Sequence, residues 1–174
     1  MRTQSLLLSI LVLPIFVFAG PLEDGLKAYQ SGQYKNAIDL LTPLAEQNNP
    51  RAQLRLGMMY YHGQGVPEDE KTALHWLTKS AEQGQRDAMF EIGNLYLVGH
   101  DAPKLTPEPD QQAAIWYNKA AMAGHAQAQY QLGLLFLAGH GVVRSDEHAY
   151  DWFRRAAALG NLDAKRALDV VRKK

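Results

Sequence analysis

Three consecutive acidic residues, Glu68, Asp69 and Glu70, are the first candidates for catalysis in this sequence. Neighbouring carboxyl groups can work as an acid–base pair when their surroundings drive their pKa values apart. These three, however, directly precede a stretch with helical apolar spacing, and acidic side chains at a helix start are stabilised by the helix dipole. We therefore interpret the run as a helix cap and not as a catalytic pair.

The six histidines suggest a metal site, but their spacing does not support one. His100 and His140 each follow a glycine in corresponding turns and are expected about one repeat apart in space. No His-Glu-x-x-His motif or Cys/His cluster is present, and His75 fits a packing or surface role on a helix. The sequence thus predicts no metal and no cofactor.

Other catalytic patterns are missing as well. Gly63 and Gly65 form a Gly-x-Gly pair, but no strand precedes it and no third glycine completes a dinucleotide fingerprint. The sequence holds no cysteine, which excludes thiol chemistry, and no Ser/His/Asp set with a nucleophile elbow. We accordingly expect no catalytic residues.

The elements that carry these residues are three copies of one pattern. The first copy has Ala52, Leu56, Gly57, Tyr60, Gly63, Trp76, Ala81 and Gly84. The second has Ala88, Ile92, Gly93, Tyr96, Gly99, Trp116, Ala121 and Gly124. The third has Ala128, Leu132, Gly133, Phe136, Gly139, Trp152, Ala157 and Gly160. A repeat of this length is typical of a solenoid, in which each unit buries its apolar face against its neighbours.

Within each copy the apolar residues have helical spacing, for example Ala52, Leu56 and Tyr60 at i, i+4 and i+8. Each copy is therefore predicted to be a helix, a glycine-rich turn and a second helix closed by a glycine. A glycine inside the first helix, such as Gly93, suggests that a neighbouring backbone passes close by. The tryptophans Trp76, Trp116 and Trp152 are expected to be buried in the space between the helices.

The domain organisation follows from these patterns. Residues 1–19 are read as a signal peptide and residues 20–50 as a divergent helix pair. The three repeats cover residues 51–85, 86–125 and 126–160, and residues 161–174 form a C-terminal capping helix. A polar outer face is what a terminal cap of a repeat stack requires.

The motif Ala-x-x-x-Leu-Gly-x-x-Tyr-x-x-Gly-x-Gly-Val, followed by Trp-x-x-Lys-x-Ala-x-x-Gly, resembles the Sel-1-like repeat family, a relative of the tetratricopeptide repeats. Residues 51–160 match it throughout, and the helix pair before them resembles a tetratricopeptide-type opening. The resemblance implies an all-α fold: a right-handed superhelical α-solenoid of about four helix-turn-helix repeats. It also implies that partners bind on the concave face built from the first helices.

Placing the repeats on that pattern predicts which residues line the concave face. They are Arg51, Leu54, Met58 and Tyr61 in the first repeat, Asp87, Phe90, Asn94 and Leu97 in the second, and Gln127, Tyr130 and Leu134 in the third. Together they would form a largely apolar, aromatic groove with a polar fringe. The alternative is that several of them are ordinary packing between helices, since leucine and aromatic residues at helical spacing usually belong to a core.

The start of the chain predicts export. Arg2 precedes an apolar run over residues 6–19, which is too short to span a bilayer comfortably and ends in small residues. We expect cleavage after Ala19 and a periplasmic or secreted protein without stable membrane insertion; an uncleaved anchor is the alternative. With 18 basic and 18 acidic residues, the chain also lacks the positive charge that drives nucleic-acid binding.

Several functions fit this description. The first is a non-catalytic periplasmic adaptor that binds a protein or peptide on the concave face. A narrower form is an immunity or inhibitor protein against a secreted antibacterial effector, and another is a regulator of envelope signalling or assembly. An enzyme acting on cell-wall material is the least favoured, because the cysteine-rich family members linked to penicillin binding or hydrolysis carry a disulfide in every repeat and this chain has no cysteine.

Overall fold

The computed structural model of the protein describes residues 20–99 and 102–171, and within these ranges it is entirely helical. The helices are α1 (Pro21–Gln30), α2 (Tyr34–Glu46), α3 (Pro50–Tyr61), α4 (Glu70–Glu82), α5 (Arg86–Val98), α6 (Ala102–Leu105), α7 (Pro109–Met122), α8 (Ala126–Ala138), α9 (Asp146–Ala158) and α10 (Leu162–Val171). The proposed signal peptide, His100 and the last three residues lie outside the described ranges.

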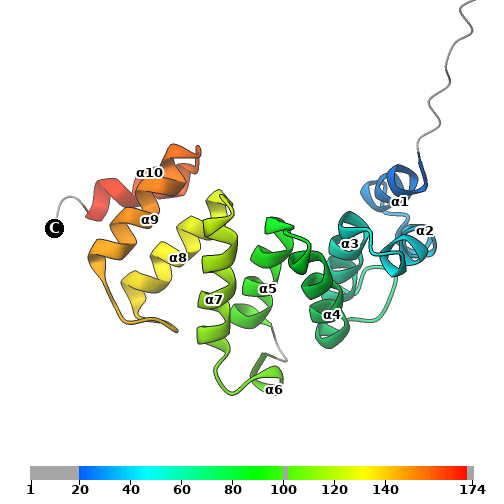
Figure 1. Cartoon of the computed structure of the whole chain (residues 1–174), viewed down its shortest axis with the longest axis horizontal. Helices are drawn as coiled ribbons and strands as arrows, with labels where there is room; N and C mark the ends of the chain where they lie inside the picture. Colours follow the sequence, from blue (N-terminus) through cyan, green and yellow to red (C-terminus); the bar gives the residue numbers. More distant parts are fainter. Residues whose placement is uncertain (1–19, 100–101, 172–174) are drawn as a thin grey trace, which may run out of the picture.

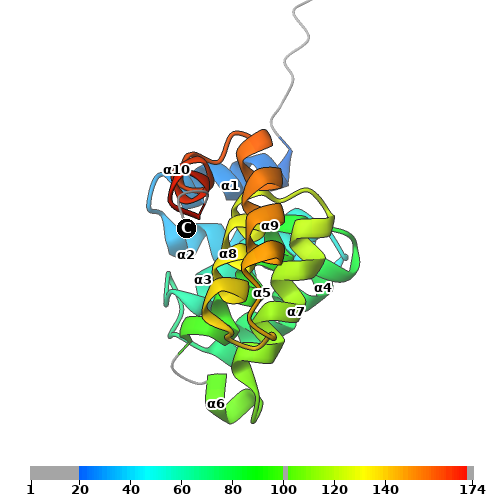
Figure 2. The same cartoon turned by 90° about the vertical axis from the view of Figure 1, so that its left-hand side faces the viewer.

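The helices form consecutive antiparallel pairs that stack in chain order (Figure 1). The pairs are α1/α2, α3/α4, α5/α7 and α8/α9, and α10 packs on α9 as a further first helix. We call the first helix of each pair the A helix and the second the B helix. Figure 2, a view along the stack, shows the B helices α4 and α7 on one side and the A helices α3 and α8 on the other. The predicted all-α solenoid is confirmed.

Local sequence sets where these helices begin and end. The side chains of Asn49 and Asp69 accept hydrogen bonds from backbone N–H groups in the first turns of α3 and α4, at 3.0–3.1 Å. Such bonds satisfy donors that have no partner inside the helix. At the other end, Gly84, Gly124 and Gly160 follow B helices with φ of +85°, +80° and +91°. Glycine adopts this left-handed conformation without a Cβ clash, so these residues stop the helices as predicted.

Inside each repeat, a glycine of the A helix meets one large side chain of the B helix. A Cβ atom built on these glycines would lie only 2.6–2.7 Å from the facing side chain, in the pairs Gly25–Leu41, Gly57–Leu77, Gly93–Tyr117 and Gly133–Phe153. All four facing side chains are fully buried. The sequence suggested that a neighbouring backbone passes close to these glycines. In the structure the space beside each glycine is occupied mainly by a side chain of the B helix.

The tryptophans do not occupy the position that the sequence predicted for them. Trp76, Trp116 and Trp152 are half-buried, and the residue after each of them fills the interior instead. Each tryptophan packs against the apolar cluster that joins its repeat to the preceding one. Its outer ring face is covered by a cation three residues later, as in Lys119, whose Nζ lies 3.8 Å from the Trp116 ring centroid. The prediction of buried tryptophans is wrong.

The main apolar clusters lie at the seams, by which we mean the boundaries between consecutive repeats. One cluster joins α4 to α5, another joins α7 to α8, and a third links α9 to α10. In α10 the place of the repeat glycine is taken by Asp169, which is exposed because no B helix packs there among the described residues.

Candidate functional site

The structure places the predicted concave-face residues along the A helices α3, α5 and α8. Arg51 and Asp87 are exposed, and the other nine side chains are half-buried. The half-buried set comprises Leu54, Met58, Tyr61, Phe90, Asn94, Leu97, Gln127, Tyr130 and Leu134. We call the surface formed by these A helices the A face.

The apolar members of this set each pack against an apolar cluster that spans a seam. Met58 packs against the α4–α5 cluster, Phe90 against the α7–α8 cluster and Tyr130 against the α9–α10 cluster. Phe90 stacks on the imidazole of His125 with ring centroids 4.5 Å apart, and the Tyr130 ring lies 5.6 Å from that of Phe153. These side chains therefore hold consecutive repeats together while keeping part of their surface on the A face.

Three of the polar members occupy the same position in successive A helices, and each contacts a residue at or beyond the boundary of its repeat. Arg51 forms an ion pair of 2.8 Å with Glu23 of α1. A carboxylate oxygen of Asp87 lies 3.7 Å from Nε2 of His125. The side-chain oxygen of Gln127 accepts a 2.7 Å hydrogen bond from Asn161. The polar fringe of the A face is therefore largely occupied by contacts between repeats.

A polar network at the centre of the A face was missed by sequence reasoning. The Tyr117 hydroxyl donates a 2.7 Å hydrogen bond to Asn94, whose amide nitrogen donates one of 3.0 Å to Glu91. Burial raises the pKa of Glu91 above its usual value, against smaller opposing effects of Asn94 and His62. The equivalent residues in the other repeats are Arg55 and Gln131, so the repeat pattern gave no signal for an acid at this position.

The end of the α3–α5 seam is hollowed and acidic. A hollow of about 260 Å³ is lined by Tyr61, His62, Glu68 and Val98, and Val98 is 67% exposed. The pKa of Tyr61 is raised by burial and then by the nearby carboxylates of Glu70, Glu91 and Glu68. This part of the A face combines an aromatic ring, an exposed aliphatic side chain and negative charge.

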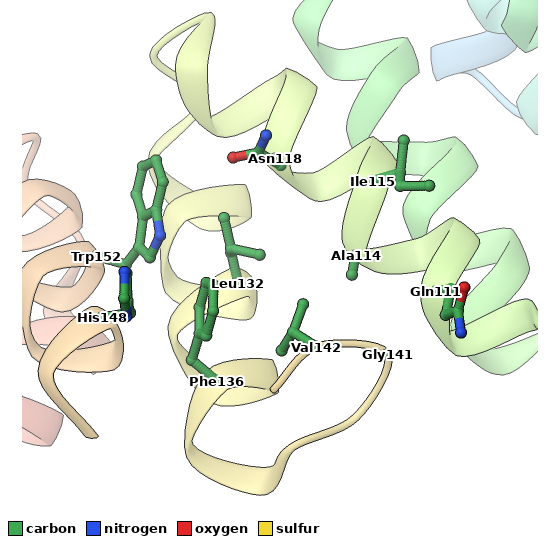
Figure 3. Close-up of a pocket in the computed structure, with 10 residues that line it drawn as sticks. All are labelled: Gln111, Ala114, Ile115, Asn118, Leu132, Phe136, Gly141, Val142, His148 and Trp152. Carbon is green, nitrogen blue, oxygen red and sulfur yellow. The ribbon is translucent and has the colours of Figure 1, made fainter. Parts of the chain in front are cut away.

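A larger hollow, of about 520 Å³, lies on the opposite side of the stack and was not predicted (Figure 3). Helices α7 and α9 form its walls, α8 forms its floor and the α8–α9 turn closes one end. The sequence contains one feature that could have predicted this hollow: Ala114 occupies the position where the two preceding helix pairs have Ile38 and Leu74. A smaller side chain at one position of a repeat leaves space at the seam.

Of the candidates for chemistry, Asp69 takes a structural role. Asp69 caps α4, and its hydrogen bonds from the Thr72 side chain and backbone lower the pKa of its carboxyl group. Over residues 20–99 and 102–171, no three His, Cys, Asp or Glu side chains are grouped so that they could hold a metal ion. Across the same ranges, no helix has the length and apolar character needed to cross a membrane.

Comparisons with known proteins agree with the fold. A Sel1 repeat profile matches residues 50–85, 86–125 and 126–161. A Sel1 repeat protein from Oxalobacter formigenes is 32% identical, with a TM-score of 0.74 over 86% of this chain and 60% of its own. The protein c5321, described as a protective antigen of uropathogenic Escherichia coli strains with an SLR fold, is 26% identical, with a TM-score of 0.76 over 87% of this chain and 32% of its own.

The cysteine-rich protein B of Helicobacter pylori is 25% identical, with a TM-score of 0.56 over 84% of this chain and 96% of its own. The chain spans less than two thirds of the length of the Oxalobacter formigenes protein and about a third of that of c5321. No curated protein sequence matches it. The repeat profile covers more than half of the residues, in the same helix pairs that the structure shows. The chain is a member of the Sel1 repeat family.

Proposed function

We propose that this protein is a non-catalytic interaction module of the cell envelope, and that it holds a protein or peptide partner on the A face. Members of this repeat class generally act as scaffolds for protein interactions. The observation that carries the proposal is the centre of the A face, where half-exposed aromatic and aliphatic side chains surround a partly buried carboxylate. A surface with no partner is usually more evenly charged and better solvated than this.

The composition of the A face suits a peptide. Tyr61, Phe90 and Val98 offer apolar contact area, and aromatic residues are frequent among the few side chains that dominate binding energy. Glu91 accepts one hydrogen bond, from Asn94, among the contacts of the described residues. Its remaining lone pairs are available to backbone or side-chain donors of a partner, and a bond made at a partly desolvated site is stronger than one in water.

The envelope location rests on the sequence of residues 6–19, which precede the described part of the chain. A short apolar run after a basic residue supports export. The absence of cysteine is compatible with this, because apolar packing and polar contacts at the seams join the repeats without disulfides.

The test compares two exposed valines on different surfaces. A photo-crosslinking amino acid is introduced at Val98 on the A face or at Val143 in the α8–α9 turn, which is 87% exposed. After irradiation of intact cells, mass spectrometry should find one recurrent adduct at position 98 and none of it at position 143. The same spectra should show a mature chain that begins at Gly20.

Binding of the identified partner is then measured with purified variants. Val98→Asp should weaken binding at least about tenfold, because a carboxylate would be placed beside Glu68 in an apolar contact. Val143→Asp is the matched control and should bind as wild type does. Both should melt like wild type, since the positions equivalent to Val98 are His62 and Ala138, which are also exposed. Equal adducts at both sites, or equal binding by both variants, would refute the A face as the site.

A further inference from the structure

The hollow between α7 and α9 is open to solvent and has an uncharged, mainly apolar lining. Figure 3 shows Ala114 and Ile115 of α7 on one side, Trp152 of α9 on the other, and Leu132 and Phe136 of α8 between them. Ile115 is 46% exposed, although aliphatic side chains of this size are usually buried. Its equivalents in the neighbouring repeats are His75 and Asp151, which are polar.

The corresponding seam one repeat earlier shows what fills such a space. There Leu74 stands in place of Ala114, and Leu105 of the short helix α6 packs against the α4–α5 cluster beside Tyr96 and Trp116. In the later seam the corresponding neighbours are Phe136 and Trp152, and the turn contributes Val142. Two leucines have thus been replaced by an alanine and a valine, which removes several methyl and methylene groups.

The surface left at the earlier seam is of a different kind. A hollow of about 450 Å³ there is lined by α4 alone, and five of its six side chains are polar or charged. The later hollow receives residues from three helices and a turn. The inserted α6 contacts α5 and α7, and its Leu105 packs against the α4–α5 cluster, so this segment helps to fill one of the two equivalent seams.

The lining also defines the chemistry of an occupant. His148 is the one ionisable side chain among the ten lining residues, and its Nδ1 lies 2.7 Å from the Ser145 hydroxyl. A charged group would lose hydration there without gaining a counter-ion, so the lining matches a neutral, aliphatic side chain. Gln111 and Asn118 lie at opposite ends of the hollow, and their side-chain amides suit the N–H and C=O groups of a peptide backbone.

The size of the hollow indicates a short segment and not a folded subunit. Ten residues line it, whereas a stable interface between folded proteins involves about 20–30 residues on each side. A volume of about 520 Å³ is within the range of sites that enclose small ligands, about 300–1,000 Å³. A second copy of this chain would need a much wider contact area.

We propose that the α7–α9 hollow is a second binding site, which takes a leucine-sized aliphatic side chain from a short peptide segment of a partner. The segment is expected to place its aliphatic side chain between α7 and α9, much as Leu105 of α6 packs against the α4–α5 cluster at the preceding seam, with its backbone at the rim. This site lies on the side of the stack opposite the A face, so the proposal can be tested independently of the proposed function.

The test uses the chain's own groove-filling segment as a probe. A synthetic peptide with the sequence of residues 102–109, which contains Leu105, is titrated into the ¹⁵N-labelled protein spanning residues 20–174. Backbone amides of α7, α9 and the α8–α9 turn should shift, together with the indole N–H of Trp152. The control peptide carries Leu105→Ala and should bind at least tenfold more weakly.

Two protein variants locate the site. Ala114→Leu copies Leu74, should fill the hollow and should weaken peptide binding at least tenfold while leaving the melting temperature at or above that of wild type. Ile115→Asp introduces, at an exposed position, the residue that the next repeat has there, Asp151, and should weaken peptide binding at least fivefold. This variant decides the outcome if Ala114→Leu fails to fold. Ala158→Leu, the same change at an exposed site of α9 outside the hollow, is the matched control and should bind normally.

Any of three results would overturn the proposal. The first is equal binding of the leucine and alanine peptides. The second is unchanged binding by folded Ala114→Leu, or by Ile115→Asp. Shifts confined to the A face would also contradict it, because the peptide would then be recognised by the other side of the stack.

Discussion

The interior of each repeat and the seams between repeats differ in how strictly they are repeated. In the interior, four glycines face Leu41, Leu77, Tyr117 and Phe153 with nearly the same close approach, 2.6–2.7 Å to an added Cβ. At the seams on the B side, the equivalent position changes from Ile38 to Leu74 to Ala114. The interior keeps the same geometry in every repeat, whereas the seam positions vary in the size and polarity of their side chains.

The difference has a physical cause. A glycine and the large side chain that fills its place depend on each other, because changing either leaves a clash or a cavity in a closely packed interior. A seam position borders solvent, so a smaller residue such as Ala114 leaves an open hollow instead of a buried void. The interior therefore maintains the fold, while the seams are free to acquire binding surfaces.

The largest expected effect is a difference in stability between alanine variants of two adjacent aromatic residues, Tyr117 and Trp116. Tyr117→Ala should destabilise the protein by about 3–5 kcal/mol, because it empties the central interior and removes the hydrogen bond to Asn94. Trp116→Ala should cost less, about 1–2 kcal/mol, because its ring is half-buried and covered by Lys119. Urea unfolding of both variants measures the difference, and an equal or reversed order would contradict the assignment of the interior.

A smaller effect is expected from adding one methyl group to the interior. Gly93→Ala would bring a Cβ within 2.6 Å of the Tyr117 ring, which is buried and cannot move freely. Overpacking of this kind costs about 1–3 kcal/mol, partly offset by the better helix propensity of alanine. Asp169→Ala is the control, since it changes the equivalent position of α10, where the aspartate is exposed. Thermal unfolding should show a loss for Gly93→Ala and none for Asp169→Ala.

The smallest effect concerns a seam and depends on pH. Nδ1 of His125 accepts the Ala128 N–H at 3.0 Å, so the cap of α8 requires an unprotonated Nδ1. Burial lowers the pKa of His125, with a smaller opposing effect of Asp87. At pH values between the lowered pKa of His125 in the folded protein and the ordinary value of 6.5, the unfolded chain binds more protons than the folded protein does. The free energy of unfolding should therefore fall as the pH drops below about 6.5.

His125→Asn isolates the pH-dependent contribution of this cap to stability, because Asn49 and Asn161 cap the equivalent helices α3 and α10 without titrating. Loss of a cap costs about 1 kcal/mol, which corresponds to roughly 2–4 °C in melting temperature for a protein of this size. Melting curves from pH 7.5 to 5.5 should show a steeper decline for wild type than for His125→Asn. Parallel curves would mean that another group controls the acid sensitivity of the seams.

The sequence by itself determined the helices, their pairing and the family. Apolar spacing, capping residues such as Asn49 and the recurring glycines are local features, and each acts within one or two turns of the chain. Repetition then implied stacking, because no single repeat can bury its apolar face alone. The helix-ending glycines and the cap at Asp69 were predicted correctly for this reason.

Only the tertiary structure decided which of two neighbouring residues faces inward. Consecutive residues on a helix differ by about 100° in direction, so the orientation of a B helix about its own axis decides whether Trp116 or Tyr117 meets Gly93. The α7–α9 hollow likewise depends on Ala114, Val142 and Trp152, which come from different elements and meet only in the stack. Glu91 became a partly buried carboxylate because α3 and α7 pack around it, and that environment is a property of the assembled repeats.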